Sequence, residues 1–96
     1  MRIAFDPAKR AWTLDVRGLD FLEADEVLGG PNFTLQDLRR DYGESRWITY
    51  GQLRGRLIAV CWTPRWTDTG FCIHVFSMRK ANEREAARYQ NQLGQG

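Results

Sequence analysis

The stretch RWITYGQLRGRLIAVCWTPRWTDTGFCIHVF, residues 46–76, decides the fold. It holds three runs of strand length that are rich in β-branched and aromatic residues, at 46–52, 56–62 and 71–76. Residues 51–55 (GQLRG) join the first two runs, and residues 63–70 (TPRWTDTG) read as a hairpin loop between the last two. Short connections of this kind predict three strands in an antiparallel meander.

The hairpin also predicts which side chains share a face. If Thr63 pairs with Gly70, three further pairs lie opposite each other: Cys61 and Cys72, Ala59 and His74, Leu57 and Phe76. Cross-strand partners point to the same face of a sheet. The other face then carries only large apolar side chains, and we expect it to be the core. Its members are Ile58, Val60, Trp62, Phe71, Ile73 and Val75.

The segments before the meander predict one more strand and two helices. Residues 2–5 (RIAF) have the composition of a short strand. A helix follows, because Asp6 is a good N-cap, Pro7 suits the first helical position and Gly18 is a typical C-terminal stop. Residues 20–30 (DFLEADEVLGG) have helical apolar spacing and end in two glycines, which predicts a second helix.

The remaining segments complete an α+β fold. Residues 31–45 (PNFTLQDLRRDYGES) are polar and rich in turn formers, so we expect a long loop with one helical turn. Asn82 and Glu85 have the spacing of a capping box, which predicts a last helix that ends at about residue 92. The expected order is β-α-α-β-β-β-α, with helices packed on a small antiparallel sheet of about four strands, in one domain that covers residues 1–96.

Charge is unevenly distributed along the chain. Residues 1–45 carry six basic and nine acidic side chains, a net charge of −3, whereas residues 46–96 carry eight basic and three acidic side chains, a net charge of +5. This separation favours one surface for a polyanion and another for a basic partner. Alternatively, the two halves mix their charges when they fold together.

Composition narrows the class of protein. No apolar run approaches the roughly 20 residues that cross a membrane, and the first ten residues have no apolar segment of a secretory signal. Two cysteines are too few for a disulfide framework. We therefore expect a cytoplasmic protein without membrane contacts.

The single histidine, His74, is the natural candidate for a general acid or base. The alternative is a partly buried strand histidine that is satisfied by a hydrogen bond. Cys61 and Cys72 lack the CxxC spacing of a zinc site, and His74 is the only other soft ligand. We expect no metal or other cofactor, and both cysteines are interpreted as small core residues.

Arg79 and Lys80 directly precede the last helix. A helix N-terminus exposes backbone N–H groups and favours anions, so this pair predicts a phosphate site that Arg84 extends by one turn. A solvated helix start is the alternative. Trp66 stands beside Arg65 in the expected hairpin loop, and cations interleaved with aromatic rings are typical of proteins that bind single-stranded nucleic acid.

Several of these segments, taken in order, resemble the BrnT family of type II toxins. The resemblance covers nearly the whole chain and includes FDPAK, RGLDFLEADEVL, ESRWITYGQLRGRLIAV, TPR and VFSMRKANEREAARYQ. The last segment is similar to a family signature at six positions: Ser77, Arg79, Lys80, Ala81, Glu85 and Tyr89. The resemblance implies a RelE-like fold and a ribonuclease that inhibits growth. It also implies a BrnA-type antitoxin and a toxin–antitoxin complex that represses its own promoter.

The resemblance also implies roles for individual residues. RNA cleavage in such a fold needs no metal, because the 2′-OH of the RNA attacks the neighbouring phosphate while the protein supplies a base, an acid and cations. Arg65, Arg79 and Lys80 are the candidates for stabilising transition-state charge, and His74 or Glu83 for carrying the proton. Four residues are candidates for binding the RNA: Arg46, Arg56, Trp66 and Arg84.

The chain departs from the family pattern at a few positions. The family often has a histidine at the end of the first helix, where this chain has Val16 and Arg17, and it tends to have arginine where this chain has His74. These departures favour an alternative function, a non-catalytic toxin homologue that acts as antitoxin partner and co-repressor. A third interpretation is an RNA-binding protein outside any toxin system.

Overall fold

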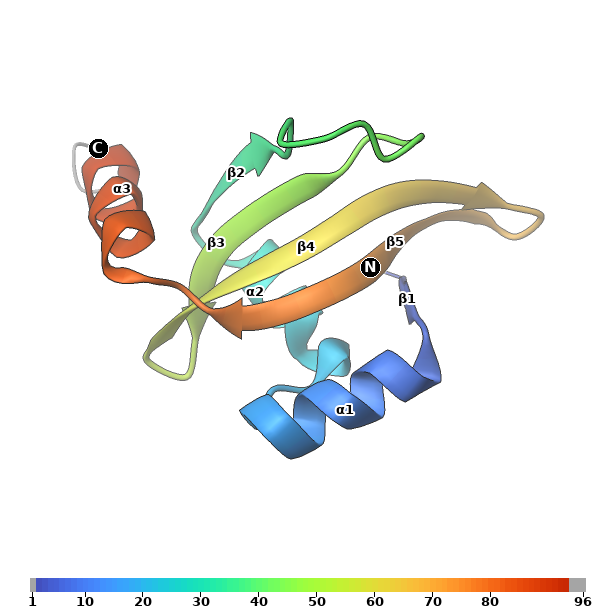
Figure 1. Ribbon diagram of the computed structural model, residues 1–96, viewed down its shortest axis with the longest axis horizontal. Coiled ribbons are helices and arrows are strands. Elements are labelled where there is room, and N and C mark those ends of the chain that lie inside the picture. The colour runs from blue at the N-terminus through green and yellow to red at the C-terminus, as the bar shows by residue number, and fades with distance from the viewer. Residues whose placement is uncertain (1, 94–96) are drawn as a thin grey trace.

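The computed structural model describes residues 2–93, and within them one mixed sheet organises the chain. The strands are β1 (Ile3–Phe5), β2 (Asn32–Gln36), β3 (Trp47–Leu53), β4 (Arg56–Thr67) and β5 (Gly70–Lys80). Their spatial order is β1-β5-β4-β3-β2, with β1 parallel to β5 and every other pair antiparallel (Figure 1). The α+β class and the meander of β3, β4 and β5 are confirmed.

The helices begin and end where the sequence signals stand. Helix α1 (Pro7–Arg17) follows Asp6, whose side chain accepts a hydrogen bond from the N–H of Ala8, and it ends at Gly18 with φ 68°. The expected second helix is a 3₁₀ turn, η1 (Phe21–Glu23), that continues into α2 (Ala24–Gly29).

Helix α3 (Glu83–Leu93) begins with the expected capping box. The N–H of Glu85 donates to Asn82 Oδ1 at 2.8 Å, and the N–H of Asn82 donates to Glu85 Oε1 at 2.9 Å. Tyr89 is the buried residue of this helix, whereas Leu93 at its end is 37% exposed. Within the described residues, no helix is long and apolar enough to span a membrane.

Two cores lie on opposite faces of the sheet. The larger one, on what we call the α2 face, joins the 3₁₀ turn and α2 to Ile58, Val60, Ile73, Val75 and Met78 of the sheet. The smaller one, on what we call the α3 face, joins Tyr89 of α3 to Ile48, Tyr50 and Ala59. Figure 1 shows α1 and α2 on one side of the sheet and α3 at its far end. Much of the α3 face therefore carries no helix.

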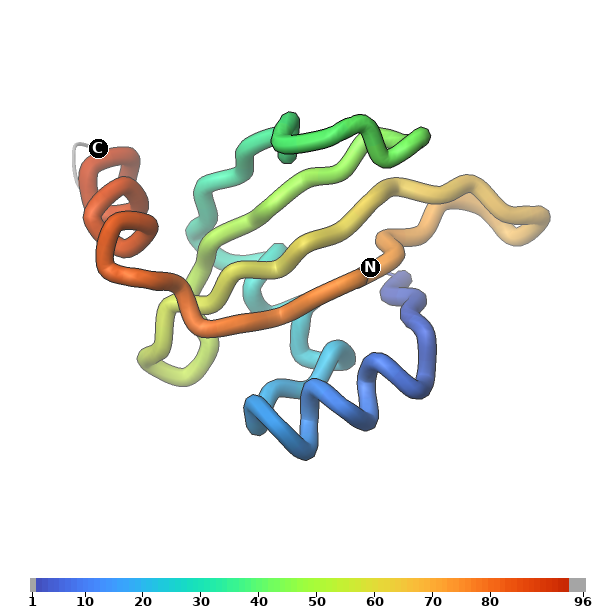
Figure 2. The backbone as a smooth tube through the Cα atoms, viewed as in Figure 1, coloured from blue at the N-terminus to red at the C-terminus, as the bar shows by residue number. Residues whose placement is uncertain are grey.

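The sheet has five strands rather than about four, because the expected loop at 31–45 is wrong in its first part. Residues Asn32–Gln36 form β2, which pairs with β3. Phe33 and Leu35 alternate along this strand and pack against the smaller core, and that burial outweighs the surrounding turn formers. The chain after β2 (green in Figure 2) runs past the end of that strand before it returns to β3.

The expected hairpin loop at 63–70 is also wrong, because β4 continues to Thr67 and β5 begins at Gly70. Pro64 is tolerated because β3 pairs with β4 only as far as Trp62, so that beyond this point one side of β4 is a free edge. The long hairpin extends past the rest of the sheet (Figure 2).

The register of the hairpin differs from the expected one as well. Thr67, not Thr63, lies opposite Gly70, and Thr63 lies opposite His74. The expected pairs Cys61–Cys72, Ala59–His74 and Leu57–Phe76 are therefore wrong. The shift is four residues from Trp62 onward and five residues from Ile58 to Cys61, because β5 has one extra residue between the two parts. The extra residue compensates for the odd shift, so side chains keep their faces, and four of the six expected core residues are buried: Ile58, Val60, Ile73 and Val75. Trp62 packs against that core, whereas Phe71 is exposed.

Candidate functional site

A β-bulge in the middle of β5 brings several sequence-predicted residues together. Trp62 lies opposite Val75 and Cys61 lies opposite Ser77, so Phe76 is the extra residue of β5. Four polar side chains surround the ring of Phe76, and we call them, together with this ring, the Phe76 cluster: Lys9, Arg46, Arg65, His74 and Phe76.

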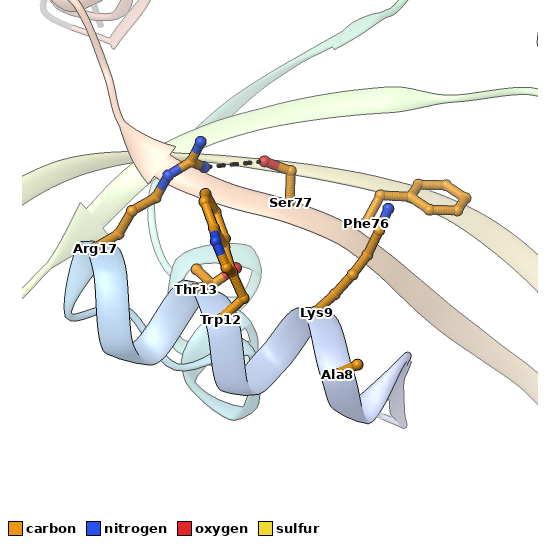
Figure 3. Close-up of a pocket in the computed structure, with 7 residues that line it drawn as sticks. All are labelled: Ala8, Lys9, Trp12, Thr13, Arg17, Phe76 and Ser77. Atoms are coloured by element: carbon orange, nitrogen blue, oxygen red, sulfur yellow. Dashed lines mark hydrogen bonds between the residues drawn. The ribbon is translucent and has the colours of Figure 1, made fainter.

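The contacts of the ring are short enough to position each group. The Arg46 guanidinium lies 4.0 Å from the centroid of Phe76, and that of Arg65 lies 5.7 Å from it. Lys9 Nζ lies 5.8 Å away, and the His74 ring packs edge-on at a centroid separation of 5.0 Å. Cations within about 6 Å of a ring face are attracted to it. Figure 3 shows the side chain of Lys9 reaching from α1 toward Phe76.

Four separate segments supply these groups. Arg46 precedes β3, Arg65 belongs to β4, His74 to β5 and Lys9 to α1. The guanidinium of Arg46 is held from its other side by the ring of Tyr42, at 4.1 Å. The hydroxyl of Tyr42 donates to Asp37 Oδ2 at 3.0 Å, which anchors that ring.

The cluster retains most of its positive charge. Arg65 contacts Glu44 at 3.4 Å, but no salt bridge involves Lys9 or Arg46 within residues 2–93. Arg46 Nε is buried and has no hydrogen-bond partner among these residues. The rings of Tyr42 and Phe76 therefore hold this cation without neutralising it, which is an arrangement suited to a polyanion.

The environment of His74 favours its neutral form, which can accept a proton. Burial lowers the pKa of His74 from the ordinary value of 6.5, and the positive charge of Arg65 lowers it further. Glu44 opposes this effect, and the remaining effects, a lowering by Lys9 and a rise by Asp6, are smaller. A lowered pKa keeps the imidazole neutral at neutral pH, and a neutral imidazole has a free nitrogen lone pair. His74 is thus a candidate general base beside the cations of the cluster.

Arg79 has a different environment. Its guanidinium donates to both carboxylate oxygens of Glu85, at 2.7 and 2.9 Å, and Tyr50 donates to the same carboxylate at 2.7 Å. We call these three residues the Arg79 clamp. The anion at the N-terminus of α3 is therefore the chain's own Glu85 carboxylate, and the clamp ties β5 to α3.

The pKa values reflect this pairing. Hydrogen bonding to Arg79 lowers the pKa of Glu85 to about 2, and the pKa of Arg79 is raised by the same bonds. Burial, followed by the bond to Glu85, raises the pKa of Tyr50 to about 12. The charge of Arg79 is thus largely compensated inside the protein.

The remaining sequence-predicted residues lie away from the cluster. Lys80 is exposed at the end of β5, Arg56 is exposed at the start of β4, and Glu83 and Arg84 are exposed in the first turn of α3. Arg79 follows His74 by five residues, which is about 16 Å along a strand. The structure therefore divides the sequence-predicted site into two groups, one at the bulge and one near the start of α3.

Trp66 lies on the long hairpin, in β4 rather than in a loop. It is 80% exposed and packs against Phe71 of β5 with a ring separation of 5.2 Å. The exposed pair of rings offers an apolar surface at the end of the hairpin that carries Arg65 and His74.

Sequence reasoning missed Lys9, Tyr42 and Phe76. Lys9 belongs to the segment FDPAK, and nothing in this segment indicates that α1 crosses the middle of β5. Phe76 reads as one more apolar strand residue, because the bulge that distinguishes it has no local signature here. Tyr42 could have been suspected, since an aromatic residue four positions before Arg46 can stack on it once the chain turns.

The cysteines do not form a site with His74. Cys61 and Cys72 are free, and burial raises the pKa of the Cys61 thiol, which disfavours the reactive thiolate. Among residues 2–93 no three His, Cys, Asp or Glu side chains come together in the manner of metal ligands.

Comparison with known protein families gives a match over most of the chain. The family model described as "Ribonuclease toxin, BrnT, of type II toxin-antitoxin system" matches residues 5–85. The chain belongs to the BrnT family. It is therefore a ribonuclease toxin, and its family implies an RNA substrate and an antitoxin partner. This membership overturns the interpretation as an RNA-binding protein outside any toxin system.

Structural comparison agrees with the family match. The chain is similar to the BrnT ribonuclease toxin of Brucella abortus, known from a crystal structure at 1.1 Å, with a TM-score of 0.64 and 27% sequence identity. The match covers 86% of this chain and 99% of that one. Comparison with curated protein sequences found no match. The BrnT-like fold is thus shared over almost the full length of the Brucella protein.

Proposed function

We propose that the Phe76 cluster is the site at which this toxin cleaves RNA, without a metal ion. The observation that supports this most directly is the gathering of three cations and a histidine of lowered pKa around one ring. A phosphodiester needs compensating positive charge as it passes through a phosphorane, and a 2′-OH needs a base. Both are present within one cluster on this chain.

Every proton that moves in the proposed reaction is donated or accepted by the RNA or by these side chains. The neutral imidazole of His74 takes the proton of the 2′-OH as that oxygen bonds to the adjacent phosphorus. The bond from phosphorus to the 5′-oxygen then breaks, and the leaving oxygen takes a proton from the Lys9 ammonium. Arg46 and Arg65 stabilise the equatorial oxygens. The products are a 2′,3′-cyclic phosphate and a free 5′-OH.

The second group of residues holds the RNA beyond the cluster. Lys80, Arg56 and Arg84 are exposed cations near the start of α3, and they bind the backbone of the strand. Trp66 stacks on an unpaired base at the other end. Arg79 acts through the clamp as a positioning residue, since its charge is compensated by Glu85. His74, rather than Glu83, carries the proton because it adjoins the uncompensated cations.

In the cell, cleavage of RNA in the cytoplasm would halt translation and growth. A BrnA-type antitoxin would neutralise the toxin, and promoter DNA would be bound by the complex only. The departures at Val16, Arg17 and His74 support the competing function, a non-catalytic homologue that serves as antitoxin partner and co-repressor.

Cleavage of a defined RNA by the purified chain in excess EDTA tests the proposal. We expect scission with 2′,3′-cyclic phosphate ends, and none at a position whose 2′-OH is replaced by hydrogen. Products with a 3′-OH, or activity that EDTA abolishes, would contradict the metal-independent mechanism. A folded chain that binds its antitoxin and represses transcription, but cleaves no RNA and arrests no growth, would establish the non-catalytic function instead.

A further inference from the structure

Helix α1 is covered on one side only. Thr13 is its one buried residue, and three large apolar side chains of the helix are exposed: Trp12 (53%), Leu14 (45%) and Val16 (58%). Leu22, in the 3₁₀ turn that follows, is 51% exposed. Trp12 and Val16 are one turn apart and therefore share one side of the helix, and an exposed apolar pair of this size is typical of a surface for a partner.

A pocket of about 460 Å³ lies between this helix and β5. Seven residues line it: Ala8, Lys9, Trp12, Thr13, Arg17, Phe76 and Ser77. Figure 3 shows the ring of Trp12 standing between the side chains of Lys9 and Arg17. The pocket is therefore an apolar recess with a cation on either side.

These two cations have no acidic partner in the part of the chain that the structure describes. Neither Lys9 nor Arg17 forms a salt bridge within residues 2–93. They are eight residues apart on one helix, which places their Cα atoms about 12 Å apart. The complementary ligand is an apolar side chain flanked by two carboxylates at a similar spacing, and a helix supplies this with an acidic, an apolar and an acidic residue at i, i+4 and i+8.

A partner strand fits this place less well than a helix. Strand β1 pairs with β5 only as far as Val75, so the edge of β5 is free of strand partners after that residue. Arg17 Nη1 donates to the carbonyl oxygen of Met78 at 3.0 Å and lies 3.5 Å from Ser77 Oγ. A side chain of α1 thus already occupies the edge that an added strand would need.

We propose that the antitoxin docks here, through an acidic amphipathic helix whose apolar residue enters the pocket against Trp12 and Phe76. The proposal rests on the proposed function, because Lys9 and Phe76 belong both to this pocket and to the Phe76 cluster. A carboxylate that binds Lys9 withdraws its charge from the RNA. The antitoxin then neutralises the toxin by competing directly with the RNA for Lys9.

A matched pair of variants on α1 tests the docking surface. Ala8 lines the pocket, whereas Ala11 is an exposed residue of the same helix that does not line it. We expect Ala8→Glu to weaken binding of the purified BrnA-type antitoxin at least tenfold by calorimetry, and Ala11→Glu to change it less than twofold. Equal affinities for the two variants, whether retained or lost, would overturn the proposal. Trp12→Ala removes the exposed ring, and we expect it too to weaken binding at least tenfold.

Competition with RNA is measured separately. An RNA with 2′-deoxyribose at the cleavage position should raise the apparent dissociation constant of the antitoxin linearly with the free RNA concentration. Simultaneous binding of both would overturn direct competition. If the wild-type chain cleaves no RNA, the proposed function fails, while the comparison of Ala8→Glu with Ala11→Glu still decides where the antitoxin docks.

Discussion

The bulge in the middle of β5 and the end of β5 near α3 hold arginine side chains in opposite ways. At the bulge, the guanidinium of Arg46 lies between two aromatic rings and has no carboxylate partner in the described chain. Near α3, the guanidinium of Arg79 is bound by both oxygens of Glu85. Rings position a cation without cancelling its charge, whereas a bidentate carboxylate cancels it. The first arrangement suits a polyanionic substrate, and the second suits a joint between two elements.

The largest expected effect concerns the proton carrier at the bulge. We expect His74→Ala to lower the first-order cleavage rate by about 10²- to 10⁴-fold, the usual contribution of a general base, with no loss of RNA affinity. Single-turnover cleavage and filter binding of a 2′-deoxy RNA measure the two quantities. A rate within fivefold of wild type would exclude His74 as the proton carrier and favour Glu83 in that role.

Breaking the Arg79 clamp should lower the stability of the protein rather than its cleavage rate. Arg79→Ala leaves the Glu85 carboxylate and the Tyr50 hydroxyl without their cation, in a partly buried place. We expect a loss of about 2 kcal/mol in the free energy of unfolding, measured by urea denaturation. Cleavage by the folded fraction should stay within about fivefold of wild type. Abolished cleavage with unchanged stability would instead make Arg79 a catalytic cation.

Some parts of the fold could be predicted from the sequence and others could not. The first and last helices were predictable because their caps are local: Asp6 with Gly18, and Asn82 with Glu85. Strand β2 was not, because its two apolar side chains stand among turn formers and its strand partner, β3, lies further along the chain, beyond the loop.

The spatial grouping of the predicted site residues was only partly predictable, for a related reason. The sequence singled out Arg65, His74 and Arg46, which the fold does bring together. It also placed Arg79 with them, because signals that are adjacent in sequence were assumed to be adjacent in space. A single inserted residue in β5, Phe76, determines which side chains meet on each face, and such a bulge depends on pairing with β4 rather than on local composition.

Acid should destabilise the protein through the Arg79 clamp. The pKa of Glu85 is about 2 in the folded protein, below its ordinary value of 4.5, so its contribution to stability is fully present above about pH 4.5 and is lost as the pH falls toward 2. Urea denaturation at pH 6 and pH 3 should therefore show a larger loss for wild type than for Glu85→Gln, which cannot titrate. Parallel losses in the two proteins would mean that the clamp does not contribute to acid unfolding.

The smallest expected effect isolates the aromatic ring of the cluster. Phe76→Leu keeps an apolar side chain but removes the π face that attracts Arg46, Arg65 and Lys9, each contact being worth about 0.5–1 kcal/mol. We expect about a tenfold fall in the cleavage rate, whereas Phe76→Tyr, which retains the face, should stay within about twofold. The pH at which the rate falls by half on the acid side should also move upward in Phe76→Leu, because cations that drift from His74 no longer lower its pKa. A leucine variant with the rate and pH profile of wild type would show that the bulge alone, without its ring, positions the cations.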